Sequence, residues 1–144
     1  MFDKTDWAHL IPHQGAMCLL DAVLEWSESS IHAVSESHAL ADHPLRGTLG
    51  LHAVHLAEYG AQAMAVHGAL LARQRGANEA RPGRLVSLRD VSIGVEWVDP
   101  SLGRLDVHAD SLYADDAGAQ YAFRVEQDGR VLVSGRAAVI HPLS

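Results

Sequence analysis

The sequence contains a single cysteine, Cys18, among 144 residues. One thiol cannot form an internal disulfide and cannot supply a pair of thiolates to a soft metal ion. Cys18 lies in the apolar run Met17 to Leu20, which favours a buried, unreactive thiol over a nucleophile. A disulfide scaffold and a cysteine-rich metal site are therefore excluded.

Long apolar stretches and positive charge are also scarce. No run approaches the roughly 20 apolar residues of a membrane-spanning helix, and residues 1–13 lack the basic and apolar regions of a secretory signal. Eleven Lys and Arg face 18 Asp and Glu, a net charge of -7. No basic stripe with interleaved aromatic residues occurs, which disfavours nucleic-acid binding. We expect a cytoplasmic protein that binds neither nucleic acid nor membrane.

What remains is the composition of a globular protein, with 48% hydrophobic and 20% charged residues. A chain of this length can bury one core but is short for two. We therefore expect a single domain over residues 1–144. Ten histidines stand out. Most suit surface or packing roles, and together they can make the net charge sensitive to pH near neutrality.

A long helix is predicted from about Leu51 to Arg75. This segment lacks proline, and apolar or small residues recur in it at helical spacing: Leu51, Val54, Ala57, Ala61, Met64, Ala65, Gly68 and Leu71. Thr48 is a candidate for the N-terminal cap. Arg73 in the last turn and Gly76 after it predict the C-terminal end. Its many small residues allow other backbone segments to approach closely.

The remaining segments have the patterns of an antiparallel sheet. Residues 19–26 and 31–35 read as a hairpin, and residues 36–50 as an irregular loop that leads into the helix. After the helix, residues 91–97 alternate apolar and polar side chains, as a half-buried strand does. Turn signals at residues 99–103, 115–118 and 128–129 separate further strands, with the last a tight hairpin.

The strand after the helix carries an irregularity. Val86 and Leu88 occupy the opposite phase from Val91 and its successors, so the alternation slips near Arg89 and Asp90. Such a slip predicts a bulge, which bends a strand. The fold class that these patterns predict is α+β: a long central helix wrapped by a curved antiparallel β-sheet.

Glu58 is the most informative ionisable residue. It falls in the middle of the predicted helix beside Ala57, Gly60 and Ala61, with Gln62 one turn further on. Small apolar neighbours hydrate a carboxylate poorly and favour its protonated form, which suits a general acid. The open alternative is a Glu58 that simply faces solvent.

The loop before the helix supplies further candidates. His38 and His43 are possible bases, and Gly47 and Gly50 are expected to leave backbone N–H groups uncovered near the positive end of the helix, where they can hold a carbonyl oxygen. A base, an acid and backbone donors meet the needs of α-proton removal from a thioester followed by loss of a β-hydroxyl. For each histidine, the alternative is a plain loop residue.

Two segments resemble a known family. Residues 10–25, LIPHQGAMCLLDAVLE, resemble the opening of the β-hydroxyacyl-carrier-protein dehydratases of the hot-dog fold. Residues 58–65, EYGAQAMA, resemble their helix motif, in which a catalytic acid precedes Ala-Gln. Residues 57–70 are more similar still to the dehydratase-like branch found in aryl-polyene gene clusters. The order hairpin, loop, long helix and meander also fits, so the resemblance covers nearly the whole chain.

The resemblance implies a hot-dog fold that forms a homodimer or a dimer-based oligomer, with acyl tunnels at the subunit interface. It implies a cofactor-free lyase that dehydrates a 3-hydroxyacyl thioester to the 2-enoyl thioester in fatty-acid or polyene-type biosynthesis. The acyl group is carried by acyl carrier protein or coenzyme A.

The same resemblance assigns roles to residues. Glu58 takes the position of the catalytic carboxyl, whose partner is a loop histidine from the other subunit. His38 falls where the family's histidine follows the second strand, whereas His43 begins a His-Pro pair that matches the one just after it. The residues implied to line the substrate site are Gly47, Gly50, Leu51, His55 and Gln62.

A metal site on the predicted helix is an alternative to this interpretation. His52, His55 and Glu58 are three residues apart and share part of one helix face. Their spacing differs from His-Glu-x-x-His and no further ligand set is evident, so we expect no metal. His52 and His55 are instead expected to cap the helix, form hydrogen bonds or line the acyl pocket near the helix entrance.

The sequence is also compatible with two other functions. The same fold and helix carboxylate can serve a thioesterase, and a noncatalytic acyl-binding or partner subunit is a third alternative. Five arginines lie between the helix end and the next strand: Arg73, Arg75, Arg81, Arg84 and Arg89. They can dock an acidic carrier protein or coenzyme A phosphates, or belong to a solvated loop.

Overall fold

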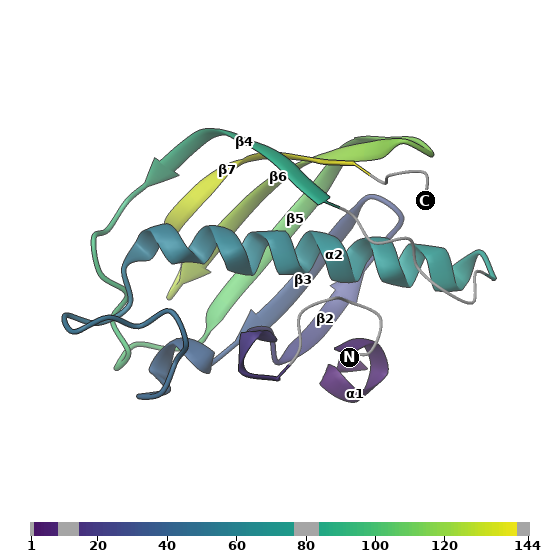
Figure 1. Ribbon diagram of the computed structural model, residues 1–144. Coiled ribbons are helices and arrows are strands. Elements are labelled where there is room, and N and C mark those ends of the chain that lie inside the picture. Colours follow the sequence, from purple (N-terminus) through teal and green to yellow (C-terminus); the bar gives the residue numbers. More distant parts are fainter. Residues whose placement is uncertain (1, 9–14, 77–83, 141–144) are drawn as a thin grey trace.

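A computed structural model describes residues 2–8, 15–76 and 84–140. In Figure 1 one long helix lies across the concave face of a curved antiparallel sheet. This helix is α2 (Leu56–Gln74), and a short 3-10 helix, Ala53–His55, leads into it. The expected α+β class, with a long central helix wrapped by a curved sheet, is confirmed.

The strands that the structure describes form one sheet in the order β1-β2-β3-β5-β6-β7-β4, and all neighbours are antiparallel. Their bounds are β1 Phe2–Asp3, β2 Ala22–Trp26, β3 Ser30–Ser35, β4 Arg84–Ile93, β5 Leu105–Ala114, β6 Gly118–Gln127 and β7 Arg130–Ile140. The short helices are α1 Lys4–Trp7 and the 3-10 helices Gly15–Met17 and Ser37–Ala39. β4 follows α2 in sequence but lies beyond β7, at the edge of the sheet (Figure 1).

The core lies between α2 and the inner face of the sheet. Along β6 the buried residues Tyr121, Phe123 and Val125 alternate with less buried ones, as expected for a strand with one covered face. Phe123 packs directly on Gly60 of α2, where an added Cβ would lie 2.6 Å from the ring. A small residue at this point therefore lets the helix approach the sheet closely.

Three local predictions are confirmed. Asp90 has φ 53°, and the register of β4 against β7 shifts between Arg89 and Ser92, so the bulge lies where the alternation slips. Gly76 has φ 84° and donates its N–H to the Arg73 carbonyl at the end of α2. The 128–129 turn, with φ 51° and 78°, joins β6 to β7.

Two local expectations need correction. The helix start is capped by His52, whose Nδ1 accepts the Val54 N–H at 3.0 Å, and not by Thr48, which lies several residues before the first helical turn. The strand after the helix ends at Ile93, and its side chains are more exposed than predicted, with 41% for Val91 and 43% for Ile93. Its place at the sheet edge explains the exposure.

Parts of other expectations fall outside the described residues, namely positions 10–14 of the family-like opening segment and Arg81. Cys18 is buried as expected, and burial raises the pKa of its thiol. Among the helices that the structure describes, none has the length and apolar character to cross a membrane.

Candidate functional site

Glu58 is half-buried near the start of α2, and Gln62 holds it. Residues four apart lie one above the other on a helix face, and the Gln62 amide donates to Glu58 Oε1 at 3.3 Å. Gln62 also donates to the Met17 carbonyl at 2.6 Å and accepts the Leu19 N–H at 2.8 Å. Both amide hydrogens are thus committed, so Gln62 orients Glu58 and ties the segment before β2 to the helix.

His43 lies on the inner side of the same helix end. Its side chain is 4% exposed, its Nε2 is 2.9 Å from the Tyr59 hydroxyl, and its Nδ1 accepts the Leu45 N–H at 3.0 Å. Burial lowers the pKa of His43, and the nearby charges of Arg46 and His55 lower it further. The imidazole is therefore neutral at physiological pH, the form that a general base needs.

His38 is also buried, but its hydrogen bonds lead elsewhere. Its Nε2 lies 3.2 Å from the Gln127 amide nitrogen, whose two hydrogens are donated to the carbonyls of Asp99 and Gly103, both at 3.0 Å. Burial lowers the pKa of His38. This arrangement anchors the Ser37–Ala39 helix to the turn before β5, whereas His43 contacts α2.

The backbone of the loop before α2 differs from the expectation. The prediction of uncovered N–H groups at Gly47 and Gly50 is wrong, because each donates to the other's carbonyl, at 2.9 and 3.1 Å. The side chain of Leu51 is fully buried, and its carbonyl accepts the Val98 N–H at 2.9 Å. The Ala53 N–H donates to Glu96. These groups hold the loop against the segment after β4.

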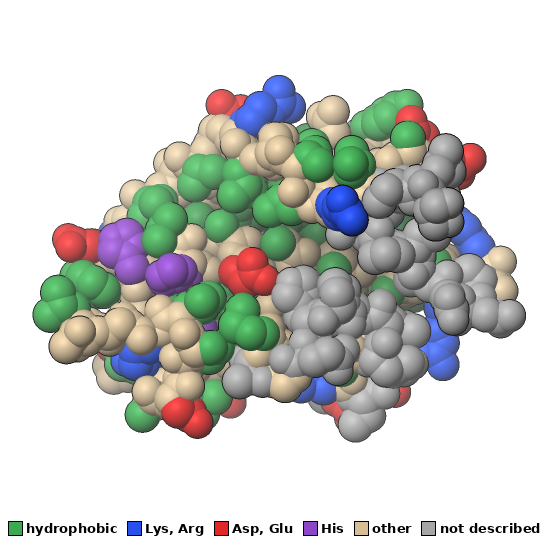
Figure 2. Space-filling model, in the orientation of Figure 1, with side chains coloured by type: hydrophobic (Ala, Val, Ile, Leu, Met, Phe, Trp, Pro, Cys, Tyr) green, Lys and Arg blue, Asp and Glu red, His purple; other side chains and the backbone are tan. Residues whose placement is uncertain are grey.

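Two histidines flank the helix entrance. His52 caps it, as expected for one of the pair, and stacks edge-on against Trp97 with ring centroids 5.2 Å apart. His55 is half-buried one turn before Glu58. Figure 2 shows histidine side chains and an acidic group bordered by apolar side chains over the N-terminal half of α2. Within the described ranges, no three side chains form a metal-binding cluster.

Sequence reasoning missed Tyr59 and Ser37. Tyr59 is fully buried and contacts both His43 and Ser37 through its hydroxyl, with the Ser37 Oγ at 2.6 Å. The only signal in the sequence is a tyrosine at a buried helical phase directly after Glu58. Ser37 carries no signal, because its partner is 22 residues away in the chain.

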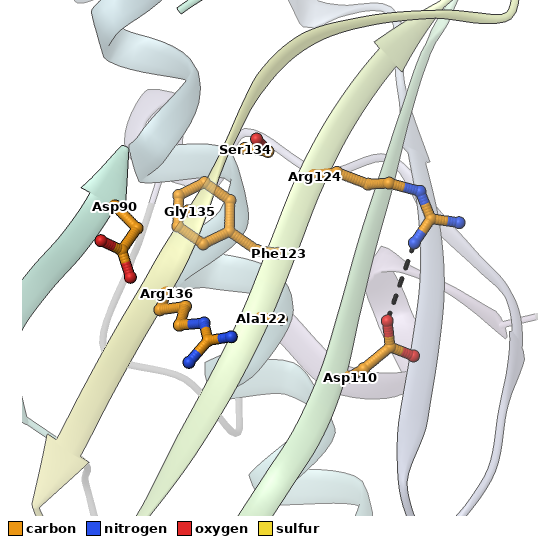
Figure 3. A pocket seen from close by; sticks show the side chains of 8 residues that line it. All are labelled: Asp90, Asp110, Ala122, Phe123, Arg124, Ser134, Gly135 and Arg136. Atoms are coloured by element: carbon orange, nitrogen blue, oxygen red, sulfur yellow. Dashed lines mark ion pairs between the residues drawn. The ribbon is translucent and has the colours of Figure 1, made fainter. Parts of the chain in front are cut away.

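A separate depression of about 290 Å³ lies on the outer face of the sheet (Figure 3). Asp90, Asp110, Arg124 and Arg136 line it, so its two positive and two negative charges balance. Arg124 pairs with Asp110 at 3.7 Å and with Glu126 at 2.8 Å. The ion pairs of Arg124 belong to a surface network on the sheet.

The helix that carries an acid and its glutamine partner, wrapped by a curved antiparallel sheet, defines a hot-dog-fold protein. Residues 5–144 match the model of the ApeP-like family, described as ApeP dehydratase. The chain belongs to this family and is a dehydratase, as the resemblance implied.

Solved structures of other proteins share this fold. The dehydratase heterocomplex ApeI:P from Xenorhabdus doucetiae is 25% identical with a TM-score of 0.84, over 95% of this chain and 91% of that chain. A thioesterase mutant from Staphylococcus aureus is 12% identical with a TM-score of 0.61, over 84% and 93% of the two chains. A mutant of the phenylacetic acid degradation protein PaaI from Thermus thermophilus is 19% identical with a TM-score of 0.59, over 83% and 91%. The last two show the shared fold alone. A search of curated proteins finds no significant match.

Proposed function

We propose that this dehydratase converts a 3-hydroxyacyl thioester into the 2-enoyl thioester and water, with Glu58 as the acid and His43 as the base. The observation that carries the proposal is the half-buried Glu58 on α2, held by the fully buried Gln62. Membership of the dehydratase family supports it. His43 is preferred to His38 because its ring contacts α2 whereas that of His38 contacts Gln127.

The chemistry requires two proton transfers. Neutral His43 takes a proton from C2 of the acyl chain, and the electron pair of that C–H bond forms the C2=C3 double bond. The C3–O bond breaks, and the Glu58 carboxyl gives its proton to the departing hydroxyl, which leaves as water. Transfer of the proton from His43 back to Glu58 restores both groups, so no cofactor is consumed.

The two groups are proposed to meet across a subunit interface. Glu58 and Tyr59 are consecutive on a helix and point about 100° apart. His43 contacts Tyr59 on the buried side, so the Glu58 that serves it is proposed to come from a second subunit. Edge strand β4 supports association, because an apolar strand edge readily pairs with another chain. Its exposed apolar residues are Leu85, Val86, Leu88, Val91 and Ile93.

The remaining assignments complete the proposal. The chain is a single hot-dog domain over residues 1–144 that works in the cytoplasm as a homodimer or dimer-based oligomer, or beside a related subunit as the name of the ApeI:P heterocomplex suggests. Its substrate is carried by acyl carrier protein or coenzyme A. The pathway is polyene or fatty-acid biosynthesis.

The decisive experiment compares Glu58→Gln with Glu28→Gln, a matched change in the exposed β2–β3 turn. Glu58→Gln keeps an oxygen that accepts from Gln62 but cannot give a proton, so kcat should fall about 10² to 10⁴-fold. Glu28→Gln should match the wild type. Enoyl formation from 3-hydroxyacyl thioesters is followed by its ultraviolet absorbance. Equal turnover by the two variants would remove Glu58 from the mechanism.

The same assay separates the rival functions. Free thiol without a new double bond, from saturated and 3-hydroxyacyl thioesters alike, would identify a thioesterase. Turnover that arises only from an added partner subunit and survives Glu58→Gln would identify a noncatalytic subunit.

A further inference from the structure

A chain of hydrogen bonds runs through the buried side of the site, from the loop before α2 to the start of β2. The Leu45 N–H donates to His43 Nδ1, and His43 Nε2 is 2.9 Å from the Tyr59 hydroxyl. From Tyr59 the chain passes to Ser37 Oγ at 2.6 Å and to Ser35 Oγ at a further 2.8 Å. Ser35 reaches the Leu19 carbonyl at 2.6 Å.

Both ends of this chain are backbone groups, so its direction is determined. A carbonyl only accepts, so the Ser35 hydroxyl donates to Leu19 and its oxygen accepts from Ser37. The Ser37 hydrogen is then used, so Ser37 accepts the Tyr59 O–H. The Tyr59 oxygen in turn accepts from His43 Nε2.

The other end leads to the same result independently. An amide N–H only donates, so His43 Nδ1 must present a lone pair to Leu45. The hydrogen of the neutral ring is then on Nε2, where it points at Tyr59. The two ends agree on one tautomer.

We propose that Tyr59 is a positioning residue that holds His43 as the tautomer with hydrogen on Nε2 and thereby leaves Nδ1 as the only basic nitrogen of the ring. This inference rests on the proposed function only for the statement that His43 is the base. Among the described residues, the Leu45 N–H, two residues along the chain, is the one hydrogen-bond donor to Nδ1, so a substrate proton competes there with a local hydrogen bond.

Tyr59 suits this task because its hydroxyl keeps its proton over the pH range in which an imidazole titrates. Burial raises the pKa of Tyr59 to about 12, although its hydrogen bond to Ser37 acts in the opposite direction. It remains a neutral hydroxyl throughout the working range of an imidazole. The groups that act on the His43 charge are Arg46, His55, His38 and Asp42, of which only Asp42 favours the imidazolium.

The chain offers a matched control for a test. Tyr121 is a second buried tyrosine whose hydroxyl lies 2.6 Å from a buried histidine, His67, and burial raises its pKa to about 12 as well. Tyr59→Phe and Tyr121→Phe therefore remove the same atom from similar surroundings. A loss of activity that reflects only general destabilisation should occur in both.

The first measurement is the ¹⁵N spectrum of the histidine rings at neutral pH, with the His43 signals assigned by their loss in His43→Gln. We expect the Nε2–H tautomer at His43 in the wild type and in Tyr121→Phe, and a reduced fraction of it in Tyr59→Phe. Ser37→Ala, which keeps the phenol but removes its acceptor, should have an intermediate effect. A wild-type His43 with hydrogen on Nδ1 would overturn the proposal.

The second measurement is the pH profile of dehydration. Hydrogen bonds from a charged donor are stronger than those from a neutral one, so loss of the Tyr59 oxygen costs the imidazolium more than the neutral ring. In Tyr59→Phe the acidic limb of kcat/KM should move to lower pH and kcat should fall about tenfold, with KM within twofold. Profiles that coincide for Tyr59→Phe and Tyr121→Phe would also overturn it.

The two failures are distinguishable. A wild-type protein that shows the expected tautomer but dehydrates no thioester would refute the proposed function and leave the role of Tyr59 in orienting His43 supported.

Discussion

Two buried histidine–tyrosine pairs lie along α2, His43 with Tyr59 near its start and His67 with Tyr121 in its second half, and their hydrogen bonds run in opposite directions. In the second half of α2, His67 Nε2 is 2.8 Å from the Ser27 carbonyl, which only accepts, so His67 Nδ1 accepts the Tyr121 O–H. Near Glu58, the tyrosine accepts from the histidine instead. The Nδ1 lone pair of His67 accepts from a tyrosine hydroxyl, whereas that of His43 accepts from the neighbouring Leu45 amide.

Burial and a tyrosine partner therefore do not by themselves decide what a histidine can do. Burial lowers the pKa of both rings, so both are neutral at pH 7. What differs is the group that faces the basic nitrogen. His67 joins the β2–β3 turn to β6, while the donor to the basic nitrogen of His43 is a backbone amide from its own loop.

The largest expected difference concerns activity. His43→Gln and His67→Gln both keep an amide N–H near the original Nε2, but both lose the basic nitrogen. His43→Gln should lower kcat/KM about 10²-fold or more, the usual contribution of a general base. His67→Gln should stay within about threefold, because His67 lies roughly 13 Å further along α2 than Glu58. Steady-state kinetics on one 3-hydroxyacyl thioester checks this, and equal losses in the two variants would contradict it.

The parts of α2 near the two pairs also differ in how closely the sheet approaches. At Gly60 an added Cβ would meet the Phe123 ring at 2.6 and 2.9 Å, whereas at Gly68 no atom lies within 4 Å. Gly60→Ala should reduce the free energy of unfolding by about 1–3 kcal/mol through overpacking. Gly68→Ala should raise it by about 0.5–1 kcal/mol, since alanine favours a helix. Urea denaturation measures both, and a neutral Gly60→Ala would refute the close packing.

The smallest expected effect is on the pH dependence of stability. Because the folded-state pKa values of His43 and His67 are lowered, the unfolded chain binds more protons than the folded chain near their range. The stability linked to these two histidines should therefore be fully present above the unfolded histidine pKa of about 6.5. It should decline as the pH falls through that value toward the folded-state pKa values. Each pKa unit of separation is worth about 1.4 kcal/mol.

Urea denaturation between pH 7.5 and 5 tests this sign. The slope should be positive in the wild type and shallower in His43→Gln and in His67→Gln, each of which removes one titrating ring. A slope that neither substitution alters would show that other groups, such as the buried His38, account for the acid sensitivity.

Much of the fold could be predicted because the decisive signals are local. The helix over residues 56–74, its glycine end at Gly76 and the turn at Asp128 each depend on a few adjacent residues. The bulge near Asp90 is also local, since a slip in alternation is visible within one strand. The cap was misplaced at Thr48 because serine and threonine caps are common, whereas a cap by His52 requires knowledge of where the first turn begins.

Of the candidate site, only the part that lies on the helix could be predicted from local signals. Glu58 and Gln62 stand four apart on one helix, so their contact follows from helix geometry alone. The glycines at 47 and 50 were expected to offer free amides, but amide availability depends on the fold of the whole loop, which pairs them with each other.

By itself the sequence determined the helix, the strands around it, and the carboxylate and glutamine on one helix face, because each is set by spacing within a single element. Only the tertiary structure decided which histidine contacts α2, which nitrogen of that ring holds the hydrogen, and how closely Phe123 packs on Gly60. These depend on atoms brought together from segments far apart in the chain, and a hydrogen bond acquires its direction only when all its partners are in place.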